Sequence, residues 1–369
     1  MTFFWFLAGL VALVVGAELL VRGASRLAVS LGLSPLVVGL TIVALGTSSP
    51  EIAVSIGAVL GGSTDVAIGN VVGSNVFNVL FILGVSALLV PLVVDSQLIR
   101  QEVPIMIGAS LLLVVLVLDR ELGRAESAAL VVLMIVYIGF LVWQSRALAR
   151  RRRERESAAG PGLPEHAIAR AARSGWDGHW AVQVAMVLVG LAGLVLGAQW
   201  LVDAAVAFAR ALGVSDLVIG LTVVAAGTSL PEVAATLAAA WRGERDMAVG
   251  NVVGSNILNI FACLGLAGLV SPAPLLVPAA VMNFDLWVML AVAAACLPVL
   301  LTGREIARWE GAVLLGYYCA YVAWLVLAAQ RHDALEAYSS AMLSFVIPLT
   351  IVTLVASAIR RPGRRGGAR

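Results

Sequence analysis

Glu51 and Glu232 are ionisable residues near the centre of long apolar segments, where a bare charge is costly. Each follows a threonine, a serine and a proline, in the sequences GTSSPE and GTSLPE. A carboxylate in such a place requires a bound cation or a proton. Two carboxylates together would neutralise one divalent ion or two monovalent ions. The pair therefore suits exchange of unlike cations at one overlapping site.

Further oxygen donors surround both glutamates in the sequence. Pro50 and Pro231 interrupt backbone hydrogen bonding and are expected to free nearby carbonyl groups. A second motif follows each glutamate, GNVVGSNVFN in the first half and GNVVGSNILN in the second. Hard cations such as Ca²⁺ and Na⁺ bind oxygen ligands, and calcium takes about 6–8 of them. Soft metals are disfavoured because these motifs contain no Cys, His or Met. The candidate ligands besides the glutamates are the hydroxyls of Thr47, Ser48, Ser74, Thr228, Ser229 and Ser255, the amides of Asn78 and Asn259, and carbonyls near Ala44 and Ala225.

These motifs also have interpretations that involve no ion. The glutamates could be protonated and hydrogen-bonded in a helix interface, and the Gly, Ser and Thr residues could serve close helix packing. The equivalent placement of both glutamates beside proline and hydroxyl residues favours ion binding instead. The remaining asparagines of the motifs are predicted to be structural and to hydrogen-bond the interrupted backbone; they are Asn70, Asn75, Asn251 and Asn256.

The motifs belong to an internal repeat. An offset of 181 residues aligns Gly16 to Pro91 with Gly197 to Pro272 without a gap, and 38 of the 76 positions are identical. Such identity indicates a duplication rather than a shared apolar bias. Each unit contains five apolar spans, an odd number, so the second half must enter the membrane in the opposite orientation. Inverted repeats of this kind are typical of secondary transporters, whose site lies near the midplane between the halves.

The elements that carry the motifs are predicted to be membrane-spanning helices. The composition is 61% hydrophobic and 12% charged with a mean hydropathy of +1.01, which excludes an ordinary soluble domain. Continuous apolar runs of about 20 residues favour helices over a barrel. The predicted fold is an all-α polytopic membrane protein with two inverted five-helix repeats, giving ten core transmembrane helices, plus an eleventh C-terminal helix. The predicted spans lie near 3–22, 33–60, 66–92, 102–118, 127–145, 180–202, 214–241, 247–270, 284–301, 309–329 and 341–359.

Arginine placement predicts the orientation, because cytoplasmic loops retain positive charge. With the N-terminus outside, 20 arginines lie on the inner side and 4 on the outer side, and the chain has no lysine. We therefore expect a multi-pass protein of the inner (plasma) membrane with a cytoplasmic C-terminus. The predicted organisation is a first transmembrane half at 1–145, a cytoplasmic linker at 146–177, a second half at 178–330, the extra helix at 341–359 and a basic cytoplasmic tail at 360–369.

Composition and motifs also exclude several classes of function. The near-neutral charge balance gives no basic surface for nucleic acid. The three cysteines lie in apolar runs and the three histidines in polar connections, which excludes a disulfide framework and a Cys/His zinc site. An intramembrane enzyme or sensor has no support, because the sequence contains no Ser/His/Asp set, HExxH or Gly-Asp protease motif. No cofactor and no obligate protein partner are expected.

GTSSPE with GNVVGSNVFN, and GTSLPE with GNVVGSNILN, resemble the two α-repeats of the cation/calcium exchanger superfamily. The resemblance is to its sodium/calcium exchanger branch and lies close to the bacterial calcium/sodium antiporters. It implies ten core helices, four central cation sites, and alternating access in which the first and sixth helices slide past the rest. The eleventh helix lies outside this pattern.

The resemblance also implies which residues bind each ion. Calcium would be held by Glu51, Glu232 and the carbonyl or hydroxyl of Thr47 and Thr228. Sodium would additionally use Ala44, Ser48, Ser74, Ala225, Ser229 and Ser255, while Asn78 and Asn259 line the centre. Some relatives, including the potassium-dependent branch, carry Asp where this chain has Asn259. The asparagine argues against potassium co-transport and leaves a site charge of −2.

The expected function is secondary active antiport that exchanges calcium for sodium and extrudes calcium. The alternative is a proton-coupled antiporter of calcium or another divalent cation, because buried glutamates can bind protons. Relatives coupled to protons usually lack the GTSxPE motif, which disfavours that alternative. The expected partners are calcium and sodium ions, which are transported, and membrane lipid.

Overall fold

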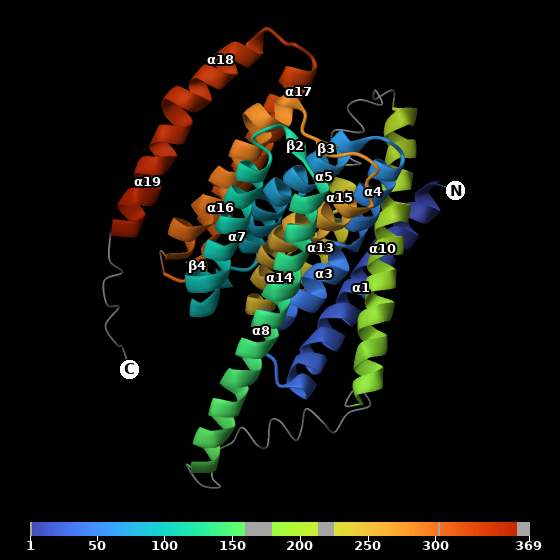
Figure 1. Cartoon of the computed structure of the whole chain (residues 1–369), viewed down its shortest axis with the longest axis vertical. Coiled ribbons are helices and arrows are strands. Elements are labelled where there is room, and N and C mark those ends of the chain that lie inside the picture. Colours follow the sequence, from blue (N-terminus) through green and yellow to red (C-terminus); the bar gives the residue numbers. More distant parts are fainter. Residues whose placement is uncertain (1, 159–178, 213–224, 302, 360–369) are drawn as a thin grey trace.

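The computed structural model describes residues 2–158, 179–212, 225–301 and 303–359, with the side chains of 151–158, 225 and 354–359 excepted. Helices make up nearly all of it (Figure 1). Most of the predicted linker, part of the predicted span 214–241 and the predicted tail lie outside these residues. The first half comprises α1 (Thr2–Leu31), α2 (Pro35–Val38), η1 (Gly39–Val43), α3 (Ala44–Thr47), α4 (Ser49–Leu60), α5 (Thr64–Phe77), η2 (Asn78–Leu83), α6 (Gly84–Leu89), β1 (Leu92–Val93), η3 (Leu98–Glu102), α7 (Val103–Leu116), β2 (Glu121–Leu122) and α8 (Arg124–Ala158), where η denotes a π-helical turn.

The second half repeats this order of elements. It comprises α10 (Trp180–Ala211), α12 (Ala225–Gly227), α13 (Leu230–Trp241), α14 (Arg245–Leu258), η6 (Asn259–Leu264), α15 (Gly265–Val270), β3 (Leu275–Leu276), η7 (Val281–Asp285), α16 (Leu286–Leu301), β4 (Glu305–Ile306) and α17 (Arg308–Ala329). The π-helical turns η2 and η6 begin at the equivalent residues Asn78 and Asn259. The chain then continues through α18 (Ala334–Ala341), η8 (Met342–Val346) and α19 (Ile347–Ile359).

Within the described residues, nine helices are long and apolar enough to cross a membrane. The pair Pro35–Thr47 and Ser49–Leu60 forms a tenth span that is bent by 41°. The bend lies where Pro50 occupies the first turn of α4 and Ser48 leaves helical geometry with ψ 4°. Proline removes one backbone donor and clashes with the preceding turn, so the span divides there into two half-helices. The predicted all-α polytopic membrane fold is confirmed.

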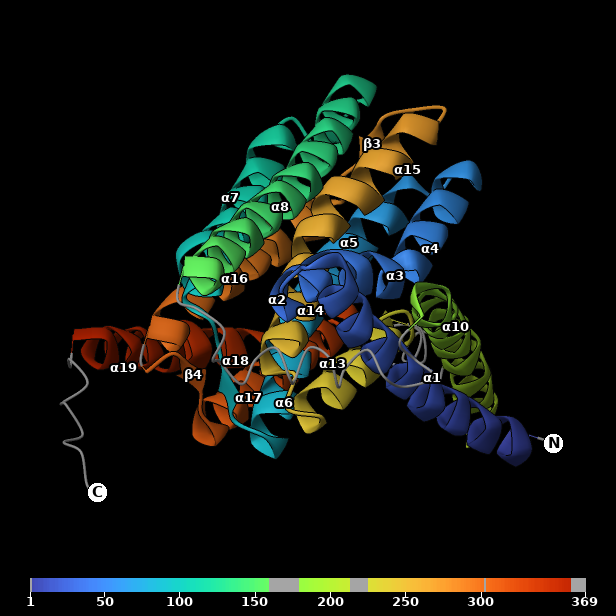
Figure 2. The same ribbon diagram turned by 90° about the horizontal axis from the view of Figure 1, so that it is seen from below.

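The centre of the molecule is formed by the third span of each repeat, α5–η2–α6 and α14–η6–α15 (Figure 2). Their apolar segments are 78% and 89% buried inside the protein, against 22% for the segment in α8. Small residues make this central packing possible. A Cβ on Gly254, for example, would lie 2.7 Å from the backbone of Leu40. The helices that carry the second motif are therefore enclosed by protein, while α8 faces outward.

The first and sixth spans, α1 and α10, pack directly against each other through glycines. A Cβ on Gly16 would lie 2.8 Å from the carbonyl oxygen of Gly190, and one on Gly9 would lie 2.8 Å from that of Gly197. The repeat offset relates Gly9 to Gly190 and Gly16 to Gly197. The contact is therefore symmetric between the halves, and it depends on residues without side chains.

Two short antiparallel ladders join loops from opposite halves. Leu92 of β1 pairs with Ile306 of β4, and Leu122 of β2 pairs with Leu275 of β3. The two ladders lie toward opposite ends of the helix bundle (Figure 1). These ladders are not predictable from the sequence, because two-residue strands have no detectable periodicity.

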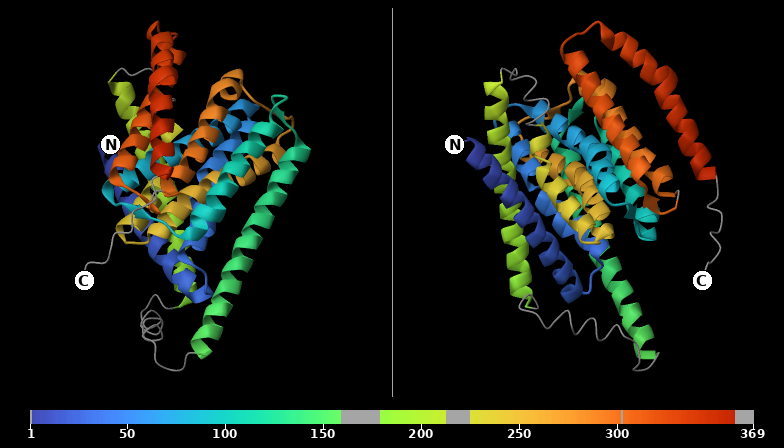
Figure 3. Two further views of the ribbon diagram at one scale, coloured as in Figure 1. Left: turned by 90° about the vertical axis from the view of Figure 1, so that its left-hand side faces the viewer. Right: turned by 180° about the vertical axis from the view of Figure 1, so that it is seen from behind.

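Several predicted boundaries differ from the structure; α1 and α10, for example, continue to Leu31 and Ala211, beyond the predicted ends at 22 and 202. Helix α8 extends to Ala158 and so enters the segment 146–177 predicted as a linker. Arg, Glu and Ala are strong helix formers, which explains why the helix continues after its apolar part ends. The C-terminal helical segment begins at Ala334, before the predicted start at 341, and lies along the outer side of α17 (Figure 3). No residue of α18 or η8 is buried.

Candidate cation-binding site

Glu51 and Glu232 lie in the first turn of α4 and α13, directly after the break in each interrupted span. Their exposed fractions are 0% and 1%. The free backbone N–H groups at the start of a helix create a partial positive charge, which favours a carboxylate at this position. The proline that precedes each glutamate therefore fixes both the interruption of the span and the place of the carboxylate.

Each carboxylate is hydrogen-bonded by a serine from the other half of the chain. Ser229 Oγ donates to Glu51 Oε1 at 2.8 Å, and Ser48 Oγ donates to Glu232 Oε1 at 3.0 Å. Ser229 Oγ also lies 3.3 Å from Ser74 Oγ. The GTSSPE and GTSLPE motifs thus meet at one place, although 181 residues separate them in sequence.

Several oxygens around this pair have no hydrogen-bond partner among the described residues. In the described part of the chain, six buried side-chain oxygens have no hydrogen-bond partner. Five of them belong to the predicted site, and the sixth is Ser86 Oγ. Leaving a buried polar atom unpaired costs about 1–3 kcal/mol, so a cluster of them calls for a ligand. Oxygens of carboxylate, hydroxyl and amide type match the preferences of a hard cation. The five in the predicted site are Glu51 Oε2, Glu232 Oε2, Asn78 Oδ1, Thr228 Oγ1 and Ser255 Oγ.

Thr47 and Ala44 both have hydrogen-bond partners, and one partner of Thr47 comes from the other half of the chain. Thr47 Oγ1 lies 3.3 Å from both the carbonyl oxygen of Ala44 and Asn251 Oδ1. The Ala44 carbonyl also accepts the backbone N–H of Ser48 at 3.0 Å. The Ala44 carbonyl therefore keeps its backbone hydrogen bond in this conformation, because the turn before Ser48 remains helical.

Pro50 does remove the backbone donor for Gly46, four residues earlier. The hydroxyl of Ser49 replaces that donor at 2.7 Å from the Gly46 carbonyl oxygen. In the second repeat the residue equivalent to Ser49 is Leu230, which has no hydroxyl. Ala225 opens α12, and its side chain lies outside the described part of the structure.

The asparagines predicted to be structural make two kinds of contact. Asn70 Nδ2 donates to the carbonyl oxygen of Glu51 at 3.3 Å, on the interrupted span as expected. Asn251 Nδ2 donates to Thr236 Oγ1 at 2.9 Å. Asn75 and Asn256 instead bond the backbone of each other's helix, because they lie where α5 and α14 cross rather than beside the broken spans.

Cys263 lies beside the candidate site and was not predicted from the sequence. Cys263 lies one helical turn after Asn259, and its Sγ is 3.6 Å from Asn259 Oδ1. The equivalent residue of the first repeat is Ile82, so only the second half places a thiol beside its asparagine. The spacing of four residues on one helix was the signal that could have found it.

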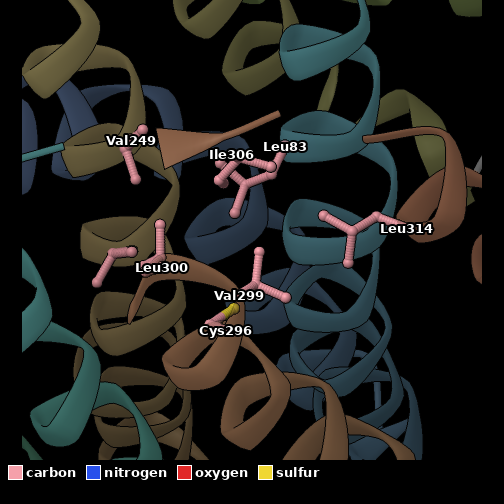
Figure 4. Close-up of a pocket in the computed structure, with 8 residues that line it drawn as sticks. Leu83, Val249, Cys296, Val299, Leu300, Ile306 and Leu314 are labelled. Atoms are coloured by element: carbon pink, nitrogen blue, oxygen red, sulfur yellow. The ribbon is translucent and has the colours of Figure 1, made fainter. Parts of the chain in front are cut away.

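The charge of the candidate site comes from its two carboxylates. Within the residues that the structure describes, no group of three or more His, Cys, Asp or Glu side chains could share a metal ion. A separate pocket near the end of α16 is lined only by apolar side chains and Cys296, so it offers a cation no oxygen (Figure 4).

Two inverted helical repeats that cross a membrane, with buried oxygens from both halves meeting at their centre, define the class of secondary transporters. The chain belongs to the sodium/calcium exchanger family. The family model, described as sodium/calcium exchanger protein, matches residues 1–143 and 182–327. The chain is accordingly a multi-pass membrane antiporter and not an enzyme.

Individual relatives support this membership over most of the chain. The putative antiporter CaxA of Alkalimonas amylolytica is 40% identical over 85% of this chain and 95% of its own length. The sodium/calcium exchanger MaX1 of Methanosarcina acetivorans is 38% identical over 86% of this chain and 96% of its own. A solved structure of the sodium-calcium exchanger NCX_Mj matches with a TM-score of 0.72 at 30% identity, covering 87% of this chain and 98% of that one.

Proposed function

We propose that this protein is a secondary active antiporter that exports calcium from the cytoplasm in exchange for external sodium. The observation that carries the proposal is the pair of enclosed glutamates, together with five buried oxygens from both repeats that have no hydrogen-bond partner in the described part of the chain. Two ionised carboxylates balance one calcium ion or two sodium ions, so either cargo leaves the centre neutral. The names of MaX1 and NCX_Mj, both sodium/calcium exchangers, support the same pair of ions.

The two ions would share ligands in this proposal. Calcium is bound by both glutamates with Thr47 and Thr228. Sodium is bound at sites that add hydroxyls and carbonyls, and two asparagines line the centre between them. The additional sodium ligands are Ala44, Ser48, Ser74, Ala225, Ser229 and Ser255, and the lining residues are Asn78 and Asn259.

Alternating access requires one part of the bundle to move while the site stays formed. We assign this movement to α1 and α10, because their glycine contact has no interlocking side chains at the points of closest approach. Arginine placement supports an N-terminus outside the cell, a cytoplasmic C-terminus and residence in the inner membrane.

Uptake of calcium-45 into proteoliposomes tests the proposal. Vesicles loaded with sodium are compared with vesicles loaded with potassium and with vesicles that carry only a pH gradient. We expect uptake only where sodium can leave. Uptake driven by the pH gradient alone would replace sodium with protons as the coupling ion, and the glutamates would then be the proton carriers. No uptake under any gradient would contradict calcium as the cargo.

A further inference from the structure

Two buried asparagines outside the proposed ligand set cross-link the halves at the centre. Asn75 Nδ2 donates to the carbonyl oxygen of Asn256 at 3.1 Å, and Asn256 Nδ2 donates to that of Asn75 at 3.3 Å. Their exposed fractions are 1% and 2%. The repeat offset relates these two residues, so the bonds form a symmetric clasp between α5 and α14.

The clasp determines which way each of its amides points. A backbone carbonyl only accepts hydrogen bonds, so the group that faces it must be the NH₂ of the asparagine. The second hydrogen of each NH₂ points to a methionine: Asn75 Nδ2 lies 3.7 Å from Met289 Sδ, and Asn256 Nδ2 lies 3.6 Å from Met106 Sδ. The amide oxygen of each clasp residue is thereby turned to its remaining side.

That oxygen meets the amide of a proposed site residue. Asn256 Oδ1 accepts from Asn78 Nδ2 at 3.0 Å, and Asn75 Oδ1 accepts from Asn259 Nδ2 at 3.1 Å. Since an oxygen acceptor requires a donor opposite it, Asn78 and Asn259 must present their NH₂ groups to the clasp. Their own oxygens therefore point away from it. Asn78 Oδ1 is one of the five buried oxygens without a hydrogen-bond partner among the described residues.

We propose that Asn75 and Asn256 are positioning residues that fix the amide orientation of Asn259 and Asn78, so that these two present oxygen rather than NH₂ to the transported cation. This inference rests on the proposed function, because it needs a cation at the centre. An amide in the reverse orientation would point N–H hydrogens at the cation and repel it. Each half thus orients the asparagine of the other half, and the orientation is lost if the halves separate at this point.

The test separates orientation from simple packing. Asn256→Leu keeps the shape of the side chain but has no oxygen to accept from Asn78, whose amide is then free to reverse. We expect the calcium concentration for half-maximal uptake to rise about tenfold, the cost of one mispaired buried polar group. The calcium dependence of the thermal unfolding temperature should shift by a similar factor. A packing role alone would lower the amount of folded protein or the maximal rate and leave the calcium concentration dependence unchanged.

A double-mutant cycle with Asn78→Asp gives the decisive comparison. A carboxylate has oxygen on both sides, so its function does not depend on the clasp. In the wild-type background, however, it would place an oxygen against Asn256 Oδ1. We therefore expect Asn78→Asp to improve calcium affinity about tenfold more in the Asn256→Leu background than in the wild type. Additive effects of the two changes would overturn the inference.

Ser110→Ala is the matched control, because Ser110 is buried and its hydroxyl donates to the carbonyl oxygen of Met106 in its own helix. It should leave the calcium dependence unchanged. If Asn256→Leu yields no folded protein, Asn75→Leu asks the same question of Asn259 with the same criterion. Failure of the proposed function is distinguishable, because the wild type itself would then show no calcium-driven stabilisation or exchange.

Discussion

At the scale of single residues, the two oxygens of each carboxylate have different surroundings. In each glutamate, Oε1 accepts a serine hydroxyl from the other half, and Oε2 has no hydrogen-bond partner among the described residues. The hydroxyl holds the carboxylate in place while one oxygen stays open. Under the proposed function, a glutamate is better suited to this position than a neutral side chain, because a bound cation would neutralise its charge inside the membrane.

Glu51→Gln and Glu232→Gln are each expected to abolish calcium exchange while the protein still inserts and folds. The amide has the shape of the carboxylate but supplies no negative charge, so one calcium ion would carry uncompensated charge into the site. The measurement is sodium-dependent calcium-45 uptake at equal amounts of reconstituted protein. Full exchange in either variant would contradict the assignment of these glutamates.

Glu102 provides the control for that experiment. It is also fully buried, but its carboxylate accepts hydrogen bonds from Gln97, Gln101 and Tyr137 and lies outside the proposed site. Glu102→Gln should retain exchange. A loss of exchange as large as that in the site variants would show that removing any buried charge disables the protein. The assignment of Glu51 and Glu232 to the cation site would then be contradicted.

Residues whose type is unusual for their immediate sequence surroundings were predictable from the sequence. Glu51 and Glu232 stand out because charge inside an apolar span is costly, and their proline neighbours mark the interruption. Hydrogen bonds between the two halves were not predictable in the same way, and the asparagine clasp is an example. Nothing near Asn256 in the sequence specifies that its amide meets the backbone of Asn75, because that contact depends on how two distant helices cross.

At the scale of elements, each half of the bundle contributes one interrupted span and one enclosed span to the candidate site. The positions of the interruptions followed from Pro50 and Pro231. The π-helical turns η2 and η6 did not follow from the sequence. They require one extra residue per turn but no distinctive residue type, so periodicity does not reveal them.

The contact between α1 and α10 gives a prediction about movement. Gly16→Ala would place a Cβ 2.8 Å from the carbonyl oxygen of Gly190, closer than atoms of these types approach, so the two helices must separate. We expect a lower maximal rate of exchange with an unchanged calcium concentration for half-maximal uptake, because the site lies on other helices. Initial rates over a range of calcium concentrations measure both quantities.

Gly139→Ala is the control for this substitution. Gly139 lies in α8, and a Cβ there would meet no atom within 4 Å. It should change neither the rate nor the calcium dependence. Equal effects of Gly16→Ala and Gly139→Ala would show that the α1–α10 contact has no special part in transport.

At the scale of the whole molecule, the two halves are fastened to each other by contacts that cross the repeat boundary. The serine–glutamate bonds and the asparagine clasp lie at the centre, and the β1–β4 and β2–β3 ladders join loops beyond the spans. Duplication predicted the inverted architecture, because an odd number of spans reverses the second half. The two ladders could not be predicted, because each forms between loops that are distant in sequence and meet only after folding.

The C-terminal helical segment lies outside this symmetric unit, and its removal should leave exchange intact. The family model ends at residue 327, and α18 and η8 contain no buried residue. Hydrogen bonds to α17 hold the segment, among them Trp324 Nε1 to Ser339 Oγ at 3.1 Å and Tyr338 OH to the Ala320 carbonyl oxygen at 2.9 Å. None of these contacts reaches the proposed site.

Truncation after residue 333 is therefore expected to lower the thermal unfolding temperature slightly and to preserve sodium-dependent calcium uptake. The orientation of the protein in the membrane should also be unchanged, because the truncated chain keeps 15 of the arginines predicted to lie inside and all 4 predicted to lie outside. Uptake and unfolding are measured on the truncated and full-length proteins side by side. If folded truncated protein lost exchange, the segment would belong to the transport unit, and the ten-helix repeat pair would not suffice for function.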